Sequence, residues 1–318
     1  MKKVAVIILD GMSYDVLDIL FKKGCMPYVK KLSDTGTNLM LQSDIPITIA
    51  AWTAMITGKK PFDSGINDQR SINYNYELCR RTLSTKTIWH ILNEHNKSIG
   101  IYNAPCVKYP VVENGFLVTG KGGPTKNSDF AYPYSIKKDI MKIWGGNFNK
   151  EINKLKYRKS SNALIERVRS VNIKNTETCK FLVDKYNPEF FTCFFTETDK
   201  LFHVVYDDLM NMEDGNVESE KSLLSLFSKI DENIKQIFSS MGDDVEKIIV
   251  SDHGFGHLDY RFDLEKWLID KGYLKLEKAG ASKSSKNFFS FKNLKYLIPR
   301  RISNYIRRYT KQELFNII

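Results

Sequence analysis

Long apolar runs, paired cysteines and histidines are all scarce in this sequence of 318 residues. No apolar stretch approaches the roughly 18 residues that a membrane-spanning helix needs. The five cysteines are scattered without a CxxC pair, which predicts reduced and mostly buried thiols. The first apolar stretch, residues 4–9, is too short for a signal peptide and stops at Asp10. These absences predict a cytoplasmic protein.

Positive charge is abundant but unevenly distributed. Residues 275–318 hold eleven Lys or Arg against two acidic residues, and therefore +9 of the net charge of +11. The preceding residues are close to neutral, so the overall charge does not indicate that the whole protein binds nucleic acid. Within this basic tail, apolar residues recur at helical spacing. Packing against the protein is the interpretation we favour, with an anionic membrane surface or nucleic acid as alternatives.

Strand-like apolar runs alternate with helical patterns along the chain. Strands are predicted at residues 4–9, 37–42, 97–104, 190–195 and 248–250, and helices at 15–23, 85–96 behind a cap at Ser84, 160–186 and 217–241. This alternation argues for an α/β fold with a mostly parallel sheet. In such sheets, ligands bind outside the carboxyl ends of the strands.

Acidic and histidine residues follow three of these strands. Asp10 closes the first strand, Asp199 and His203 come just after the strand at 190–195, and Asp252 and His253 close the last one. Carboxylates and imidazoles together suit zinc, and also manganese or iron. A single aspartate at a strand end is usually a turn or cap residue. Five such residues at strand ends favour a metal site.

Thr48 stands at the start of the helix-like stretch "IPITIAAWTAMITGKKP", residues 45–61. A hydroxyl at a helix start is commonly an N-cap. A helix N-terminus also favours a bound phosphate, and a hydroxyl held there by a metal ion becomes a nucleophile. This stretch alone leaves both interpretations open.

Four separated motifs carry a resemblance to a known family: "VIILDGMSYD", "PITIAAWTAMITGKKP", "TETDKLFH" and "SDHGFG". In this order they resemble the type I phosphodiesterase/nucleotide pyrophosphatase family of the alkaline phosphatase superfamily. The similarity is greatest to cytoplasmic members predicted to be phosphohydrolases or phosphomutases, which continue with a stretch like "RFDLEKWLIDKGYL". The resemblance implies an α/β three-layer sandwich with a mostly parallel central sheet. It further implies a catalytic domain over residues 1–274, a cap insertion at about 68–159 and a separate basic helical tail at 275–318.

The resemblance also implies an activity and a set of site residues. The expected enzyme uses two divalent metal ions, zinc or alternatively manganese, to cleave a phosphodiester, pyrophosphate or phosphomonoester, with nucleotides among the phosphorylated substrates. Thr48 is the implied nucleophile and forms a phosphothreonine, since it stands nine residues before Thr57-Gly58. The implied ligands are Asp10, Thr48, Asp252 and His253 for one ion, and Asp199 and His203 for the other.

The chain departs from the family pattern in three places. Ala50 and Ser64 stand where relatives usually have proline and histidine. The third ligand of the second ion is normally a histidine well downstream, and no histidine follows His257. His257 is a candidate substitute, with an ordinary loop residue as the alternative. We therefore expect a C-terminally shortened member, with the remaining ligand on absent sequence.

Two other functions stay open at this point. In a phosphomutase or phosphotransferase, an alcohol in place of water takes the phosphoryl group from the threonine. In a non-catalytic binding module, the fold persists without turnover, and the missing third ligand favours this interpretation.

Overall fold

The computed structural model describes residues 2–67, 85–105, 112–120, 130–148, 152, 161–212, 218–260 and 262–274. The chain divides into two compact units, Met1–His257 and Leu258–Ile318. Ser84 and the predicted basic tail lie outside the described residues. In the second unit, the described residues contain the short helix α11 (Leu264–Asp270), which Asp263 caps by accepting a hydrogen bond from the Lys266 amide.

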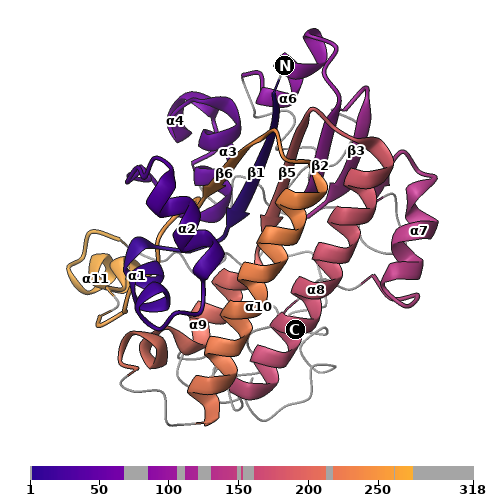
Figure 1. The fold of residues 1–318 in the computed structure, drawn as a ribbon. Helices are drawn as coiled ribbons and strands as arrows, with labels where there is room; N and C mark the ends of the chain where they lie inside the picture. The colour runs from indigo at the N-terminus through magenta and orange to yellow at the C-terminus, as the bar shows by residue number, and fades with distance from the viewer. Residues whose placement is uncertain are drawn as a thin grey trace, which may run out of the picture. The chain divides into compact units, whose positions relative to one another are not determined.

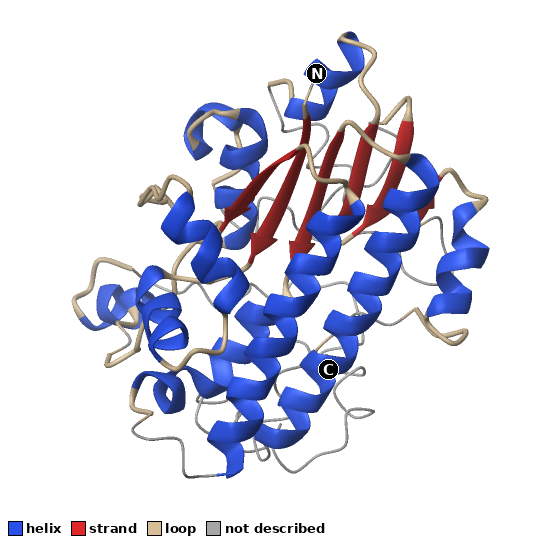
Figure 2. Cartoon of the chain, in the orientation of Figure 1, coloured by secondary structure: helices blue, strands red, loops and turns tan. Residues whose placement is uncertain are grey.

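A six-stranded sheet forms the centre of the first unit (Figure 2). Its order is β4-β3-β2-β5-β1-β6, and every neighbouring pair is parallel except β3 and β4. The strands are β1 (Lys3–Leu9), β2 (Ile99–Ala104), β3 (Gly115–Thr119), β4 (Ala131–Tyr132), β5 (Phe190–Phe195) and β6 (Val245–Val250). The predicted α/β fold with a mostly parallel sheet is therefore confirmed.

Helices cover both faces of this sheet. Successive side chains of a strand point to opposite faces, and apolar side chains on each face have to be covered. On β1, Ile7 belongs to a core cluster with side chains of α8 and α10, while Ile8 belongs to a second cluster with Trp52 and Trp89. Figure 1 shows α8 and α10 crossing the same face of the sheet. The helices are α1 (Tyr14–Lys22), α2 (Pro27–Thr35), α3 (Thr48–Thr57), α4 (Pro61–Ser64), α6 (Ile88–Glu94), α7 (Ile136–Ile143), α8 (Ser161–Tyr186), α9 (Glu197–Met210) and α10 (Glu218–Ser240).

Two local predictions are wrong. Residues 37–42 form no strand, because they pair with no neighbouring strand, and the side chains of Leu39, Met40 and Leu41 are exposed. The helix expected over residues 85–96 begins only at Ile88, and its N-cap is Thr87. Thr87 and His90 close a reciprocal capping box there, which uses His90 structurally.

The range predicted as a cap insertion, residues 68–159, contains β2, β3 and β4 of the central sheet. Much of the rest of this range lies outside the described residues, and the cap insertion stays a prediction. Across the described part of the chain, no helix has both the length and the apolar character that a membrane span requires. Cys25, Cys179 and Cys193 are buried and form no disulfide.

A buried aspartate joins two helices of the first unit. Asp231 on α10 accepts hydrogen bonds of 2.8 Å from the amides of Tyr28 and Val29 in the first turn of α2. These amides have no partner within their own helix, so Asp231 caps α2 from another element. Burial raises the pKa of Asp231, and the two amide donors oppose this rise by stabilising its charge.

Replacing this capping carboxylate will destabilise the protein. We expect Asp231→Ala to lower the free energy of unfolding by about 1–3 kcal/mol, because two buried amides lose their acceptor. Urea unfolding followed by circular dichroism measures the change. The matched control is Asp34→Ala, which removes an exposed pair with Lys30 on α2 and is expected to cost under about 0.5 kcal/mol. Equal losses in the two variants would contradict the capping role.

Candidate active site

Three adjacent strands bring the predicted site residues together. In the order β5-β1-β6, Leu9 is in register with Phe195 and Ile8 with Val250, so the carboxyl ends of these strands lie side by side. Asp10 follows β1 directly, α9 starts two residues after β5, and Asp252 lies two residues after β6. The topology therefore explains why residues more than 240 positions apart in sequence meet.

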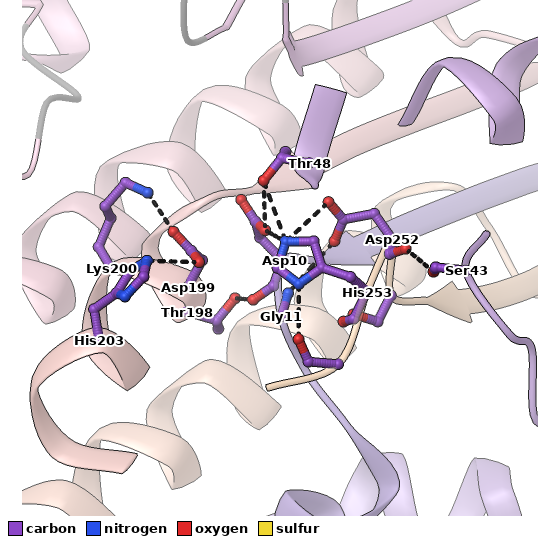
Figure 3. A network of polar contacts seen from close by, with 12 residues as sticks. Asp10, Gly11, Ser43, Thr48, Thr198, Asp199, Lys200, His203, Asp252 and His253 are labelled. Atoms are coloured by element: carbon purple, nitrogen blue, oxygen red, sulfur yellow. Dashed lines mark hydrogen bonds and ion pairs between the residues drawn. The ribbon is translucent and has the colours of Figure 1, made fainter. Parts of the chain in front are cut away.

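Thr48, Asp10 and His253 meet at this edge of the sheet (Figure 3). The Oγ1 atom of Thr48 lies 3.2 Å from His253 Nε2 and 3.5 Å from Asp10 Oδ1. His253 Nε2 is in turn 3.3 Å from Asp10 Oδ1. A hydroxyl, a carboxylate and an imidazole nitrogen thus form a compact triangle.

Thr48 is the first residue of α3 and does not cap it. Ile47 occupies the N-cap position and makes no side-chain capping bond. The hydroxyl of Thr48 instead turns to Asp10 and His253. Of the two interpretations that the sequence left open, capping is excluded, and the hydroxyl is available at the positive end of the helix dipole.

A hydrogen bond to the backbone fixes the orientation of the His253 ring. Its Nδ1 donates to the Gly254 carbonyl oxygen at 2.8 Å, which leaves Nε2 facing Thr48 and Asp10. Burial opposes a charge on this ring, but Asp10 and Asp252 outweigh it and raise the pKa of His253 to about 9. Burial also disfavours the charge on Asp10. It therefore raises the pKa of Asp10, and the neighbouring Asp199 adds to the rise.

Asp252 has a buried oxygen without a hydrogen bond. Its Oδ1 accepts a long bond of 3.4 Å from the Gly11 amide, while Oδ2 has no hydrogen-bond partner among the described residues and lies 3.6 Å from His253 Nε2. Burial, reinforced by the charge of Asp10, raises the pKa of Asp252 to about 7. A buried carboxylate oxygen in this state is suited to bind a cation.

The second part of the site lies at the start of α9. His203 Nε2 is 3.3 Å from Asp199 Oδ1, as their i, i+4 spacing predicts, and Lys200 contacts the Oδ2 atom of Asp199. Burial disfavours the charge of Asp199, but His203 and Lys200 hold its pKa below the usual range. Figure 3 shows Asp199 between these two side chains and Asp10. Phe255 packs edge-to-face on the His203 ring, with centroids 5.1 Å apart.

His257 lies in the loop that follows β6 and contacts α9 away from the other site residues. Its Nδ1 is 2.6 Å from Asp207 Oδ1, and both side chains are exposed. Asp207 follows Asp199 by two helical turns, a rise of about 12 Å along the axis. His257 is therefore partnered outside the group formed by the other site residues.

The backbone around the site depends on Gly11 and Thr198. Gly11 has a φ of +74°, and a Cβ there would lie 3.6 Å from both the Asp199 Cα and a His253 ring carbon. The buried hydroxyl of Thr198 donates to the carbonyl oxygens of Asp10 at 2.6 Å and Phe195 at 3.1 Å. Thr198 thus ties the start of α9 to the ends of β1 and β5.

Sequence reasoning missed Gly11, Thr198 and Lys200. Gly11 directly follows a candidate ligand, and Lys200 lies between two of them, so position alone gave a signal for both. Thr198 gave none, because its role is a contact to a strand 188 residues away.

The side chains present fit metal ions. Two ligands about 2.1 Å from a tetrahedral zinc lie about 3.4 Å apart. The distances among Thr48, Asp10 and His253 are 3.2 Å, 3.3 Å and 3.5 Å, and His203 lies 3.3 Å from Asp199. Single ligand atoms of Asp10, Asp199 and His253 all lie within 4.8 Å of one another. Carboxylates and imidazoles are also the donor set that zinc and manganese accept.

An α/β sandwich with carboxylates, histidines and a hydroxyl at its strand ends has the arrangement of an alkaline-phosphatase-like hydrolase. The sequence model of the type I phosphodiesterase/nucleotide pyrophosphatase family matches residues 4–310. Because this match spans nearly the whole chain, the chain belongs to that family, a family of hydrolytic enzymes. A comparison with curated protein sequences gave no match.

If Asp252 is a metal ligand, replacing its carboxylate should weaken the binding of zinc. Zinc at one hundred times its Kd adds about 2.7 kcal/mol to the free energy of unfolding. We expect Asp252→Asn to reduce this gain to about 0.4 kcal/mol, as a hundredfold loss of affinity implies. Thermal unfolding in a chelator and in zinc measures it. The control Asp18→Asn changes an exposed aspartate on α1 and should keep the full zinc effect. An undiminished gain in Asp252→Asn would exclude Asp252 as a ligand.

Proposed function

We propose that this chain is a metal-dependent phosphohydrolase that cleaves a phosphodiester, pyrophosphate or phosphomonoester through a phosphothreonine on Thr48. The observation that carries the proposal is the position of the Thr48 hydroxyl. It makes no capping bond and lies 3.2 Å from His253 Nε2 and 3.5 Å from Asp10 Oδ1. Membership of a phosphodiesterase family supports the same reaction class.

Two divalent ions, zinc or alternatively manganese, complete the proposed site. Asp10, Asp252 and His253 would hold one ion beside Thr48, and Asp199 with His203 would hold the other. Bound there, the ions supply positive charge that activates the threonine hydroxyl and offsets the charge of the phosphate and leaving oxygens. The oxygen of Asp252 that lacks a hydrogen bond and the close spacing of Asp10, Asp199 and His253 support this assignment.

In the proposed reaction, Thr48 Oγ1 gives up its proton to solvent and attacks phosphorus in line with the leaving oxygen. The Thr48 O–P bond forms while the P–O bond to the leaving group breaks, and the leaving oxygen takes that electron pair and a proton. Water then cleaves the Thr48 O–P bond and restores the hydroxyl, which releases phosphate from a phosphomonoester substrate and a phosphomonoester from a phosphodiester. The N-terminus of α3 supports the phosphate, because its free amides and dipole favour an anion.

The proposed substrate is a small phosphorylated molecule, with nucleotides as the first class to examine. The proposed location is the cytoplasm, and the three buried cysteines without a disulfide are compatible with a reducing compartment. Proposed domain limits place catalysis within residues 1–274.

Thr48 substitutions test the mechanism directly. We expect Thr48→Ala to lose at least about a thousandfold in kcat on bis-p-nitrophenyl phosphate in zinc, because no other hydroxyl replaces the nucleophile. Thr48→Ser should keep measurable turnover. Thr35→Ala is the control, since the Thr35 hydroxyl only donates to the Lys31 carbonyl within α2.

The intermediate has its own readout. Acid quenching during turnover, followed by peptide mass spectrometry, should place a phosphoryl group on the peptide that contains Thr48. Added glycerol should divert part of the product to a phosphoglycerol ester if the chain acts as a phosphotransferase. Unchanged turnover in Thr48→Ala contradicts the nucleophile assignment. A wild type that binds zinc without hydrolysing any of the three ester classes points to the non-catalytic alternative.

A further inference from the structure

Lys200 makes an unusual ion pair at the edge of the site. It contacts Asp199, its immediate neighbour in α9. Side chains at i and i+1 of a helix do not face each other, so Lys200 has to bend around the helix to reach this carboxylate. Other helical pairs in the first unit, such as Lys174–Glu177 and Lys229–Glu232, have the ordinary i, i+3 spacing and exposed partners.

The pair is also partly withdrawn from solvent. The Lys200 side chain is 18% exposed and that of Asp199 is 7% exposed. Lysine seldom gives up its hydration without a specific partner, because transferring a charge from water is costly. The ammonium group of Lys200 therefore lies inside the candidate site, where it neutralises a carboxylate that metal ions would otherwise bind.

Lys200 is also within reach of the reacting groups. It contacts Asp199, whose ligand atom lies within 4.8 Å of those of Asp10 and His253. Figure 3 shows the Lys200 nitrogen directed at the Asp199 carboxylate, with Asp10 and Thr48 on the other side of that carboxylate. A phosphate held at Thr48 has several anionic oxygens, and a lysine ammonium offers three donors on a flexible stem.

We propose that Lys200 leaves Asp199 when that carboxylate binds a metal ion, and then donates to an oxygen of the substrate phosphate. This inference rests on the proposed function and adds a residue to it. The two positions of Lys200 follow from one requirement, that its partly buried charge keeps an anionic partner. Asp199 is that partner in the metal-free site, and the phosphate replaces it in the loaded site.

The proposal predicts opposite effects on two ligands. Lys200→Met removes the charge and keeps the apolar stem. Zinc should bind about tenfold more tightly to this variant, because Asp199 loses a competing cation. Inorganic phosphate should bind the zinc-loaded variant about ten- to a hundredfold more weakly, because a charge-assisted hydrogen bond is lost. Lys200→Arg should recover part of the phosphate affinity.

Calorimetry separates this proposal from the proposed function. Both ligands are titrated in a Thr48→Ala background, which prevents turnover, and phosphate is titrated with zinc and with a chelator. Lys174→Met is the matched control on the surface of α8. In the control background, zinc should strengthen phosphate binding, and Lys200→Met should reduce that coupling about tenfold or more.

Each outcome has a definite meaning. Equal zinc–phosphate coupling with and without Lys200→Met refutes the role of Lys200 and leaves the hydrolase proposal intact. Weaker zinc binding in Lys200→Met also refutes it, because the lysine would then organise Asp199 for the metal instead of competing for it. A parent protein that binds no zinc refutes both proposals together.

Discussion

The repulsion among three buried carboxylates is the constraint on which the rest of this site depends. Asp10, Asp199 and Asp252 are each at most 5% exposed, and they lie at the adjoining ends of β5, β1 and β6. Burial raises the pKa of Asp10 and Asp252, and a neighbouring carboxylate, Asp199 for the first and Asp10 for the second, adds to each rise. In the metal-free chain, His253 and Lys200 supply the compensating positive charge. In the proposed function, metal ions replace both.

The scaffold maintains this unfavourable arrangement through contacts that lie outside the site. Thr198 fixes the start of α9 to the strand ends, and Gly11 allows β1 to turn directly beneath Asp199 and His253. The Ser43 hydroxyl donates to the Asp252 carbonyl oxygen at 2.6 Å and holds the loop after β6 in place. Stability generated by the core thus keeps together groups that would separate if free.

Much of the fold was predictable, because the buried strands and amphipathic helices have clear periods. The site residues were predictable as a set because parallel strands end at one edge of the sheet. Predictions failed where a residue's role depends on a partner distant in sequence. Residues 37–42 have a strand-like composition but form no strand pairing with the described part of the chain. Lys200 resembles a solvated helix residue until the burial of Asp199 is known.

The segment "TETD" shows why a carboxylate in a motif needs structural context. Glu197 and Asp199 are both acidic, both buried and both in the first turn of α9. Glu197 accepts hydrogen bonds of 3.0 Å from the side-chain amides of Asn172 and Asn175, and these asparagines bond onward to Asn233 and Tyr102. A buried carboxylate that is hydrogen-bonded by neutral donors on packed helices has a structural role in the core.

Asp199 has the opposite environment. Its partners in the described structure are Lys200 and His203, and His203 is 38% exposed whereas His253 is 9% exposed. Partners at an exposed edge of the site can be exchanged for a metal ion or a substrate without breaking the core. Two acidic residues one position apart are thereby separated into a structural and a reactive one. The distinction arises because side-chain amides of α8 donate to Glu197, whereas Asp199 is paired with Lys200 and His203.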